Sequence, residues 1–334
     1  MVLNPSLPNS LIPASPLHPF TSNAAASVSA LGETRLIECI RRWLGDVSPP
    51  APFGIGDDCA VLAPNPRQQL VTTDPVIYGR HFDDTVPPRA VGEKLLKRNL
   101  SDLAAMGARP TAAVVSLALD PRVSTRWLAG FYRGLAEAAR RFGVAIVGGD
   151  VAQSDGFLGA FLTLFGEATG PRLLLRTGAQ PGDWIYITGT LGGSLRGRHW
   201  RFPPRLAEGA WLARRREVRA MMDVSDGLAK DLLALAPPGS KPALSAPSIP
   251  VSRDARAQAR STGRTPLHHA LCDGEDYELV FAVARRADRP AFLRAWRRAF
   301  PRLRLSCIGR FLPEREIPAD VLRLDAFHGY EHLQ

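Results

Sequence analysis

The chain has 334 residues, of which 45% are apolar and 22% are charged, with a formal net charge of +10. These values are typical of a water-soluble globular protein with room for two domains. No apolar run approaches the ~20 residues that cross a bilayer, so we expect a soluble, cytoplasmic protein with no membrane partner. Its 4 cysteines are far apart and form no Cys-x-x-Cys pair, which argues against a zinc site and a disulfide framework.

The positive charge is almost all arginine and is concentrated in residues 196–219 and 285–304. Such clusters can bind nucleic acid or attract an anionic small substrate. In the second cluster, Phe292 and Trp296 recur with alanines at helical spacing, which predicts an amphipathic helix with a solvated basic face. We therefore expect no nucleic-acid partner. An RNA-binding or scaffold protein is the alternative from another functional class.

Residues 1–30 contain no Asp, Glu, Lys or Arg and are rich in Pro, Ser, Asn and Ala. They lack the basic start and apolar core of a signal peptide, and also the arginines of a transit peptide. We interpret them as a disordered tail or extension. Folding is expected to begin near Gly32, followed by an amphipathic helix over 36–44.

Strands and helices are expected to mix in both halves of the remaining chain. In the first half, the patterns predict strands at 61–62, 70–73, 111–119, 144–147 and 157–167, and helices at 91–106 and 127–142. In the second half, they predict strands at 184–188, 221–224 and 279–281, and helices after Pro204, through 231–235 and over 291–299. Residues 237–268 show no clear pattern. This mixture predicts an α/β (α+β) fold, with one domain at 31–168 and another at 169–334.

Carboxylates recur at the edges of apolar strands or inside apolar helices, where an unpaired charge would be costly. The set comprises Asp58, Asp74, Asp102, Asp150, Asp223, Asp226 and Glu275. A lone Asp in such a setting is more often a helix cap or a turn residue than a ligand. If the set converges, however, mutual repulsion would call for cations, and all-oxygen ligands favour magnesium over zinc. Our working hypothesis is therefore a magnesium-phosphate site.

The familiar phosphate-binding and hydrolytic motifs are absent from the sequence. There is no Gly-Lys dipeptide, hence no Walker A loop, and neither His-Arg-Asp nor Asp-Phe-Gly of a protein kinase occurs. His-Glu-x-x-His and Gly-x-Ser-x-Gly are missing as well. The acid-rich set is thus unlike the phosphate-binding motifs of the commonest nucleotide-binding folds.

An ordered series of short motifs resembles the successive motifs of bacterial thiamine-monophosphate kinases. The motifs lie at 54–60, 72–74, 99–108, 147–150, 183–190, 223–228 and 274–279. They follow the family's order and span residues 32–334. The family belongs to the aminoimidazole-ribotide-synthetase-like superfamily, whose members are two-domain α/β proteins that dimerise through their N-terminal sheets. The resemblance therefore implies this fold and a homodimer.

The resemblance also implies an activity and a set of site residues. The activity is ATP-dependent phosphorylation of thiamine monophosphate to thiamine diphosphate, by in-line phosphoryl transfer within a magnesium cluster, with Asp102 and Arg176 as catalytic residues. Magnesium would be held by Asp58, Thr72, Thr73, Asp74, Asp102, Asp150, Asp223 and Asp226. ATP would contact Gly149, Asp150, Arg176 and Ser225, and thiamine monophosphate would contact His81, Glu275 and Tyr330.

Three features depart from the family pattern. Asp273 stands where the family usually has glycine, the segment 193–205 is shorter than usual, and the tail at 1–30 has no counterpart. The nearest alternative is a sister enzyme that uses ATP on another acceptor. Selenophosphate synthetases carry a reactive Cys and a Lys in an N-terminal glycine loop, and hydrogenase-maturation relatives end in a cysteine. Neither feature is present here.

Overall fold

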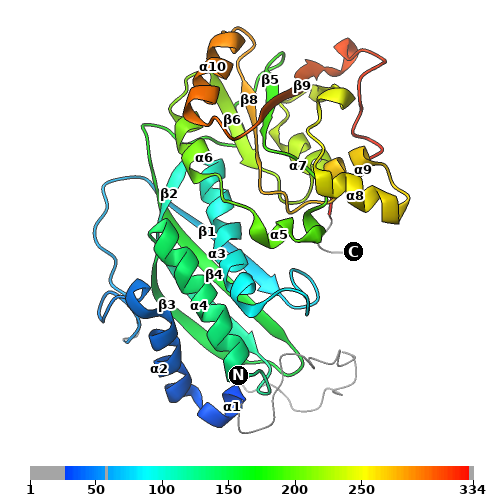
Figure 1. Ribbon diagram of the computed structural model, residues 1–334. Helices are drawn as coiled ribbons and strands as arrows, with labels where there is room; N and C mark the ends of the chain where they lie inside the picture. The colour runs from blue at the N-terminus through cyan, green and yellow to red at the C-terminus, as the bar shows by residue number, and fades with distance from the viewer. Residues whose placement is uncertain (1–26, 57–58, 331–334) are drawn as a thin grey trace, which may run out of the picture.

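The computed structural model describes residues 27–56 and 59–330 and contains two sheets with their covering helices (Figure 1). The predicted mixed α/β fold is confirmed. Asp58 and most of the predicted tail at 1–30 lie outside the described residues. Within the described part, a short helix α1 (Val28–Leu31) precedes α2 (Glu33–Leu44).

The first sheet has four strands in the order β1-β4-β2-β3. These are β1 (Gln69–Ile77), β2 (Ala108–Leu119), β3 (Ala145–Gln153) and β4 (Leu158–Ala168). β4 pairs antiparallel with β1 and β2, whereas β2 and β3 are parallel and are connected by α4 (Thr125–Phe142). A parallel pair needs such a crossover, because its second strand must start at the same end as its first.

The two faces of the first sheet differ in what covers them. Helices α3 (Pro88–Ala105) and α4 pack against one face (Figure 1). Side chains alternate between the faces along a strand. Consequently Leu162 and Leu164 of β4 are fully buried beneath the helices, while Val71 of β1 and Phe161 of β4 are exposed on the other face. That uncovered apolar face is a feature of an interaction surface.

The second sheet has five antiparallel strands in the order β6-β8-β5-β9-β7. These are β5 (Trp184–Thr188), β6 (Val218–Asp223), β7 (Ser240–Leu244), β8 (Leu279–Val283) and β9 (Leu305–Pro313). The helices of this half are α5 (Arg198–Arg201), α6 (Leu206–Ala213), α7 (Leu228–Leu235), α8 (Arg253–Thr262), α9 (Pro266–Cys272) and α10 (Arg289–Ala299). β8 is buried at every position, as expected for a central strand with both faces covered.

Helix α3 is the element that joins the two halves. Its backbone comes close to α4, because a Cβ on Gly134 would lie 1.9 Å from Arg89 O. On the α6 side, a Cβ on Gly209 would lie 2.0 Å from Ala104 O. Small residues at both contacts allow this close packing, which buries most of α3 from Ala90 onward, so that its buried polar side chains must find partners inside the protein.

Most predicted elements are confirmed to within a few residues, and three expectations are wrong. The tail expected to reach residue 30 ends earlier, because α1 precedes Gly32 and buries Val28 in the core. The expected strand at 61–62 is irregular chain, since these residues make no strand pairing. The strand expected to end before Asp74 continues to Ile77, because β4 supplies a pairing partner along its whole length. Residues 237–268, which carried no pattern, hold β7 and α8. Among residues 27–56 and 59–330, no helix is both long enough and apolar enough to cross a membrane.

Replacing Gly134 with Ala is expected to destabilise the fold by about 1–3 kcal/mol, because the new methyl group overlaps Arg89 O of α3. The matched control is Gly130→Ala on the same helix, whose Cβ would lie 3.0 Å from the Pro88 side chain. There the gain in helix propensity, about 1 kcal/mol, offsets the tighter contact. Urea unfolding measures both variants. Equal stability of the two would contradict the close α3–α4 packing.

Candidate functional site

Oxygen-bearing side chains from three elements meet where α3 passes between the two sheets. Thr72 and Asp74 lie on the helix-covered face of β1, since their strand partners Leu164 and Leu162 are buried there. The Thr72 hydroxyl donates to Asp102 Oδ2 of α3 at 2.5 Å. The Ser101 hydroxyl donates to Asp223 Oδ2, at the end of β6, at 2.6 Å. Predicted ligands from both halves of the chain are therefore neighbours.

The carboxylates of this cluster carry more negative charge than their surroundings compensate. Burial, followed by repulsion from Asp223 and Asp74, raises the pKa of Asp102 to about 7. Burial also raises the pKa of Asp223, although the hydrogen bond from Ser101 opposes this shift. The exposed Arg176 guanidinium lowers both pKa values but does not cancel the shift. Additional positive charge would therefore be stabilised here.

Arg98 brings one fixed positive charge into the cluster. Its guanidinium Nη2 lies 3.4 Å from Asp74 Oδ1, and its side chain is only 9% exposed. The Nε and Nη1 atoms are buried and find no hydrogen-bond acceptor among the described residues. Arg98 thus partly neutralises Asp74, at the cost of donors that are left unsatisfied.

The turn between β6 and α7 is organised by Asp231. Its Oδ2 accepts hydrogen bonds from the amides of Ser225 and Asp226, both at 2.9 Å. Asp226 itself pairs with Lys230, with 2.9 Å between Oδ2 and Nζ, and its carbonyl accepts the Tyr330 amide at 2.8 Å. The predicted site residues Ser225 and Asp226 consequently lie in one turn, and Tyr330 is attached to it.

Glu275 belongs to a loop that packs on this turn. Its amide donates to Ser225 O at 2.7 Å, and its carboxylate pairs with buried Lys94 of α3 at 2.7 Å. Burial would raise the pKa of Glu275, but the charge and hydrogen bond of Lys94, together with the smaller effects of Arg98 and His199, hold it below the usual value. The loop containing His81 is attached to the same lysine, because Lys94 Nζ donates to His81 O at 2.6 Å.

Thr73 and Asp150 are placed away from this cluster. Thr73 faces the opposite side of β1, where it accepts a hydrogen bond from Thr163 Oγ1 at 3.3 Å. Asp150 is exposed on β3, at the other edge of the sheet from β1. Three strand spacings separate these edges, roughly 14 Å. Within one chain, therefore, Thr73 and Asp150 do not join Thr72, Asp74 and Asp102.

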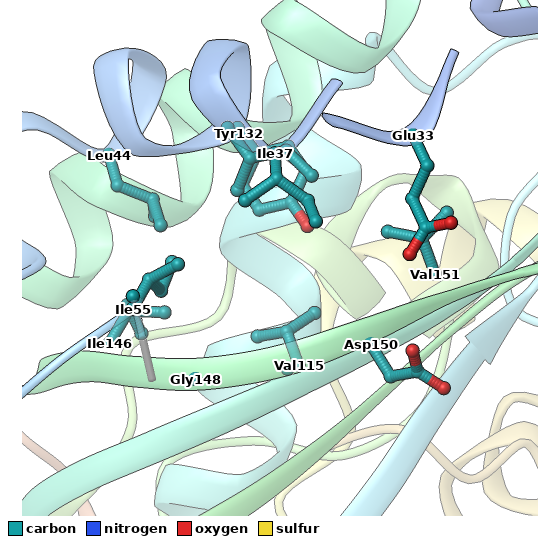
Figure 2. Close-up of a pocket in the computed structure, with 13 residues that line it drawn as sticks. Glu33, Ile37, Leu44, Ile55, Val115, Tyr132, Ile146, Gly148, Asp150 and Val151 are labelled. Atoms are coloured by element: carbon teal, nitrogen blue, oxygen red, sulfur yellow. The ribbon is translucent and has the colours of Figure 1, made fainter. Parts of the chain in front are cut away.

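A cavity of about 500 Å³ lies between α2 and the β3 edge of the first sheet (Figure 2). Apolar side chains from α2, α4 and β3 form most of its lining, including Ile37, Tyr132 and Ile146. Gly149 and Asp150 line its sheet side. Only glycine fits at 149, because a Cβ there would lie 2.0 Å from Val115 O. The cavity has the mixed apolar and polar lining of a ligand pocket.

The donor chemistry of the cluster fits magnesium, although a formed metal site is not present. In the part of the chain that the structure describes, no three or more Asp, Glu, His or Cys side chains are grouped closely enough to hold a metal ion. Thr72, Asp74, Asp102 and Asp223 nevertheless offer hard oxygen donors at a place with excess negative charge. The predicted ligand Asp58 lies outside the described residues.

Four residues of the site were missed by the sequence prediction: Lys94, Arg98, His199 and Asp231. The available signal was a charged side chain among apolar helical neighbours. Lys94 and Arg98 are four apart within the run ending at Asp102, which places all three on one stripe of α3. His199 had no such signal, because its partner Lys94 is 105 residues away in the sequence.

The two departures from the family pattern in the second half contact each other. Asp273 Oδ2 accepts the amide of Gly193 at 2.7 Å, at the start of the shortened segment. Its other oxygen, Oδ1, lies 2.8 Å from His269 Nδ1. The additional acid is thus paired with the protein rather than directed toward Glu275, and it anchors the shortened segment.

Several arginines of the basic clusters are engaged within the protein. Arg205 forms two hydrogen bonds with the Glu278 carboxylate at 2.8 and 2.7 Å. Arg215 lies over the Trp211 ring at 3.9 Å, and Arg289 over the Trp184 ring at 3.7 Å. These contacts give the arginines structural roles. The absence of a nucleic-acid partner stays a prediction.

Comparison with known proteins gives consistent matches. Residues 56–170 match the family described as AIR synthase related protein, N-terminal domain. A thiamine-monophosphate kinase of Rhodopirellula baltica is 42% identical over 248 residues, which cover 71% of this chain and 77% of that protein. The crystal structure of thiamine-monophosphate kinase from Stenotrophomonas maltophilia has a TM-score of 0.69 at 34% identity, covering 83% of this chain and 93% of that one. A solved AaThiL complexed with AMPPCP and TMP has a TM-score of 0.68 at 29% identity, covering 91% and 97%.

Replacing Asp231 with Asn is expected to stabilise the metal-free protein at pH 8 and to do so less at pH 5. Burial raises the pKa of Asp231 from 3.8 to about 7, equivalent to about 4 kcal/mol at most. Between about pH 4 and 7, the folded state therefore keeps the Asp231 proton, whereas the unfolded state has already released it. The contribution of this group to the free energy of unfolding of wild type falls as pH rises through that window. Asn keeps the acceptor for the Ser225 and Asp226 amides without the charge.

Urea unfolding of wild type and Asp231→Asn at both pH values measures the difference, to which titrating groups remote from Asp231 contribute equally in the two proteins. Asp231→Ala is the matched control. It also removes the acceptor and should destabilise the turn relative to Asn at either pH. A difference between wild type and Asn that does not change with pH would contradict the raised pKa.

Proposed function

The chain belongs to the thiamine-monophosphate kinase family of enzymes, and we propose that it transfers the terminal phosphoryl group of ATP to the phosphate of thiamine monophosphate, giving thiamine diphosphate. The observation that carries the proposal is the convergence of Thr72, Asp74, Asp102 and Asp223 at the junction of the two halves. The AaThiL complex with AMPPCP, an ATP analogue, and TMP supports the assignment of both substrates.

The proposed reaction needs charge compensation more than proton transfer. The acceptor is a phosphate that is already ionised near neutral pH, so a general base has little to do. The obstacle is repulsion between two anions that must approach in line, and binding them in a fixed orientation overcomes it. Arg176, which lowers the pKa values of Asp102 and Asp223 through its charge, is placed to stabilise negative charge on the transferring group.

We propose that Thr72, Asp74, Asp102 and Asp223 hold magnesium, with Asp58 and Asp226 as further ligands. When bound, magnesium would neutralise the carboxylates and the phosphate oxygens together. The raised pKa values of Asp102 and Asp223 support this, because they identify charge that the protein alone leaves uncompensated. Asp226 has Lys230 as its partner in the structure, so the role proposed for Asp226 requires Lys230 to release it.

The nucleotide is proposed to occupy the cavity beside β3. Its apolar lining suits a base, while Gly149 and Asp150 lie on the side that leads to the sheet. A Cβ at Gly149 is excluded by Val115 O of β2, so this position would offer the nucleotide only its backbone groups. Because Asp150 and the acid cluster lie at opposite edges of the sheet within one chain, Ser225 and Arg176 of a second copy would contact the phosphates of this nucleotide.

Thiamine monophosphate is proposed to bind among His81, Glu275 and Tyr330. Glu275 offers a carboxylate to the cationic thiazolium ring, and the half-exposed Tyr330 ring offers an aromatic face. The turn that holds Tyr330 also holds Ser225 and Asp226. The substrate would thus lie next to the residues that handle the phosphates.

A homodimer formed through the uncovered face of the first sheet is part of the proposal. This face exposes Val71 and Phe161, both large apolar residues. Thr73 lies on the same face, and Asp150 is exposed at its edge. A second copy packed on this face would bring its own side chains toward Thr73 and Asp150. These two predicted ligands could then belong to a site shared by the two copies, although they join no site within one chain.

Asp102→Asn is expected to reduce thiamine diphosphate formation from thiamine monophosphate, ATP and magnesium at least 100-fold, because it removes a charge from the site of transfer. The variant should fold at least as stably as wild type without metal, since Asn still accepts from Thr72 and no longer repels Asp74 and Asp223. Product formation is followed by chromatography, and unfolding by urea titration.

Asp155→Asn, an exposed acid outside the site, is the matched control and should retain activity. If folded wild type binds ATP but makes no thiamine diphosphate, the proposed acceptor is wrong and a sister reaction is favoured. If wild type does not bind ATP, the alternative of an RNA-binding or scaffold protein is favoured instead. Retained activity in Asp102→Asn would contradict the site assignment.

Val71→Lys is expected to weaken the dimer, because it places a charge on the apolar face proposed as the interface. Sedimentation over a range of concentrations should show a dimer for wild type and a shift toward monomer for the variant. The control is Leu233→Lys on α7, where a comparably exposed leucine lies in the other half of the chain: Val71 is 65% exposed and Leu233 51%. A monomeric wild type would contradict the proposed assembly.

A further inference from the structure

A buried lysine on α3 holds together the two loops that carry two of the proposed contacts to thiamine monophosphate, His81 and Glu275. Lys94 is completely buried, and its ammonium group has three partners at hydrogen-bond distance. These are His81 O at 2.6 Å, Glu275 Oε1 at 2.7 Å and His199 Nδ1 at 2.7 Å. Since an ammonium has three donors, every donor is used, and this explains how the charge can be buried.

The three partners come from three separate segments of the chain. His81 lies in the loop after β1, His199 in the short helix α5, and Glu275 in the loop before β8. Burial and the Lys94 charge lower the pKa of His199 to about 4, so its ring is neutral near pH 7. Because Nδ1 accepts from the lysine, the ring proton resides on Nε2. His199 thus acts as an acceptor that completes the shell around Lys94.

The Glu275 loop is in a backbone conformation that needs support. Glu275 and Tyr277 have φ of 51° and 52°, in the left-handed region that side-chain-bearing residues seldom adopt. The loop is held by the Glu275 amide on Ser225 O at 2.7 Å and the Tyr277 amide on Val224 O at 2.8 Å. The Tyr277 hydroxyl donates to Glu275 Oε1 at 3.2 Å. Lys94 provides the charged contact to the same oxygen, which fixes the carboxylate as well as the backbone.

We propose that Lys94 is a positioning residue for the acceptor substrate, which orients the Glu275 carboxylate and ties the His81 loop to it so that both meet thiamine monophosphate in a preformed arrangement. This inference rests on the proposed function, because it assigns Lys94 to the acceptor pocket of that reaction. Lys94 touches neither substrate nor the transferring phosphoryl group. Replacing Lys94 should therefore weaken the binding of thiamine monophosphate and leave the binding of ATP little changed.

The chain offers a matched control on the same helix. Lys97 is also buried, and its ammonium donates to Trp200 O at 2.5 Å, next to His199, and lies 3.7 Å from Glu93. Both lysines tie α3 to the segment around α5, yet only Lys94 reaches Glu275 and His81. A purely structural role would therefore affect Lys94→Met and Lys97→Met alike.

The experiment compares wild type, Lys94→Met and Lys97→Met in steady-state assays and in titrations with thiamine monophosphate alone. For Lys94→Met, we expect KM and Kd for thiamine monophosphate to rise roughly 10- to 100-fold, the range for losing a charge-assisted contact at a positioned group. KM for ATP should change less than about threefold. Lys97→Met should keep both KM values near those of wild type.

A double-mutant cycle with Glu275→Gln tests whether Lys94 acts through Glu275. Once the carboxylate is gone, Lys94→Met should raise KM for thiamine monophosphate by a smaller factor than it does in wild type, because, of its contacts with the two loops, only the contact with His81 O remains to be lost. If Lys94→Met alone does not fold, the double variant, which buries no unpaired charge, is compared with Glu275→Gln alone. A KM less than about tenfold higher in the double variant would support the inference, and a rise of tenfold or more would overturn it.

Three results would overturn the inference while wild type is active. They are equal effects of Lys94→Met and Lys97→Met, a fall in kcat with unchanged KM for thiamine monophosphate, and additive effects in the cycle. If folded wild type forms no thiamine diphosphate, the proposed function itself fails, and the inference fails with it. The wild-type assay therefore separates the two failures.

Discussion

The burial of α3 between the two halves is the constraint on which the site depends. A helix surrounded by protein cannot leave charges unpaired, yet Lys94, Arg98 and Asp102 lie on one of its stripes. Each of them therefore has a partner from another element: Glu275 for Lys94, Asp74 for Arg98 and Thr72 for Asp102. The packing that joins the two sheets is thus also what assembles the site.

The two ends of this stripe differ in how far the protein compensates the charge of the carboxylates beside them. At one end, the pKa of Glu275 is lowered, because the contacts with Lys94 and the nearby charge of Arg98 together exceed the cost of burial. At the other end, the pKa values of Asp102 and Asp223 are raised, because burial and mutual repulsion exceed the help from Arg176. The first end is complete without a ligand, as suits a preformed pocket for an organic substrate. The second gains stability from added cations, as suits a site for phosphates and metal.

The sequence predicts elements well where one local pattern decides them. Helix α3 and strand β5 follow from the spacing of their apolar residues, and the resemblance places Asp102 and Asp223 in one site. The sequence does not predict β7, which lies in a stretch rich in proline and serine, because that strand forms through its pairing with β9. Nor does it predict the contact of Lys94 with His199, since nothing local in either segment indicates a partner 105 residues away.

Strand geometry also limits what a compact motif can mean. Thr72, Thr73 and Asp74 are consecutive, and the sequence alone groups them as three ligands of one site. In an extended strand, however, neighbouring side chains point to opposite faces. Thr72 and Asp74 therefore face α3, whereas Thr73 faces the uncovered side with Thr163. The motif therefore presents Thr72 and Asp74 on one face of the strand and Thr73 on the other. A single site within one chain cannot use all three side chains.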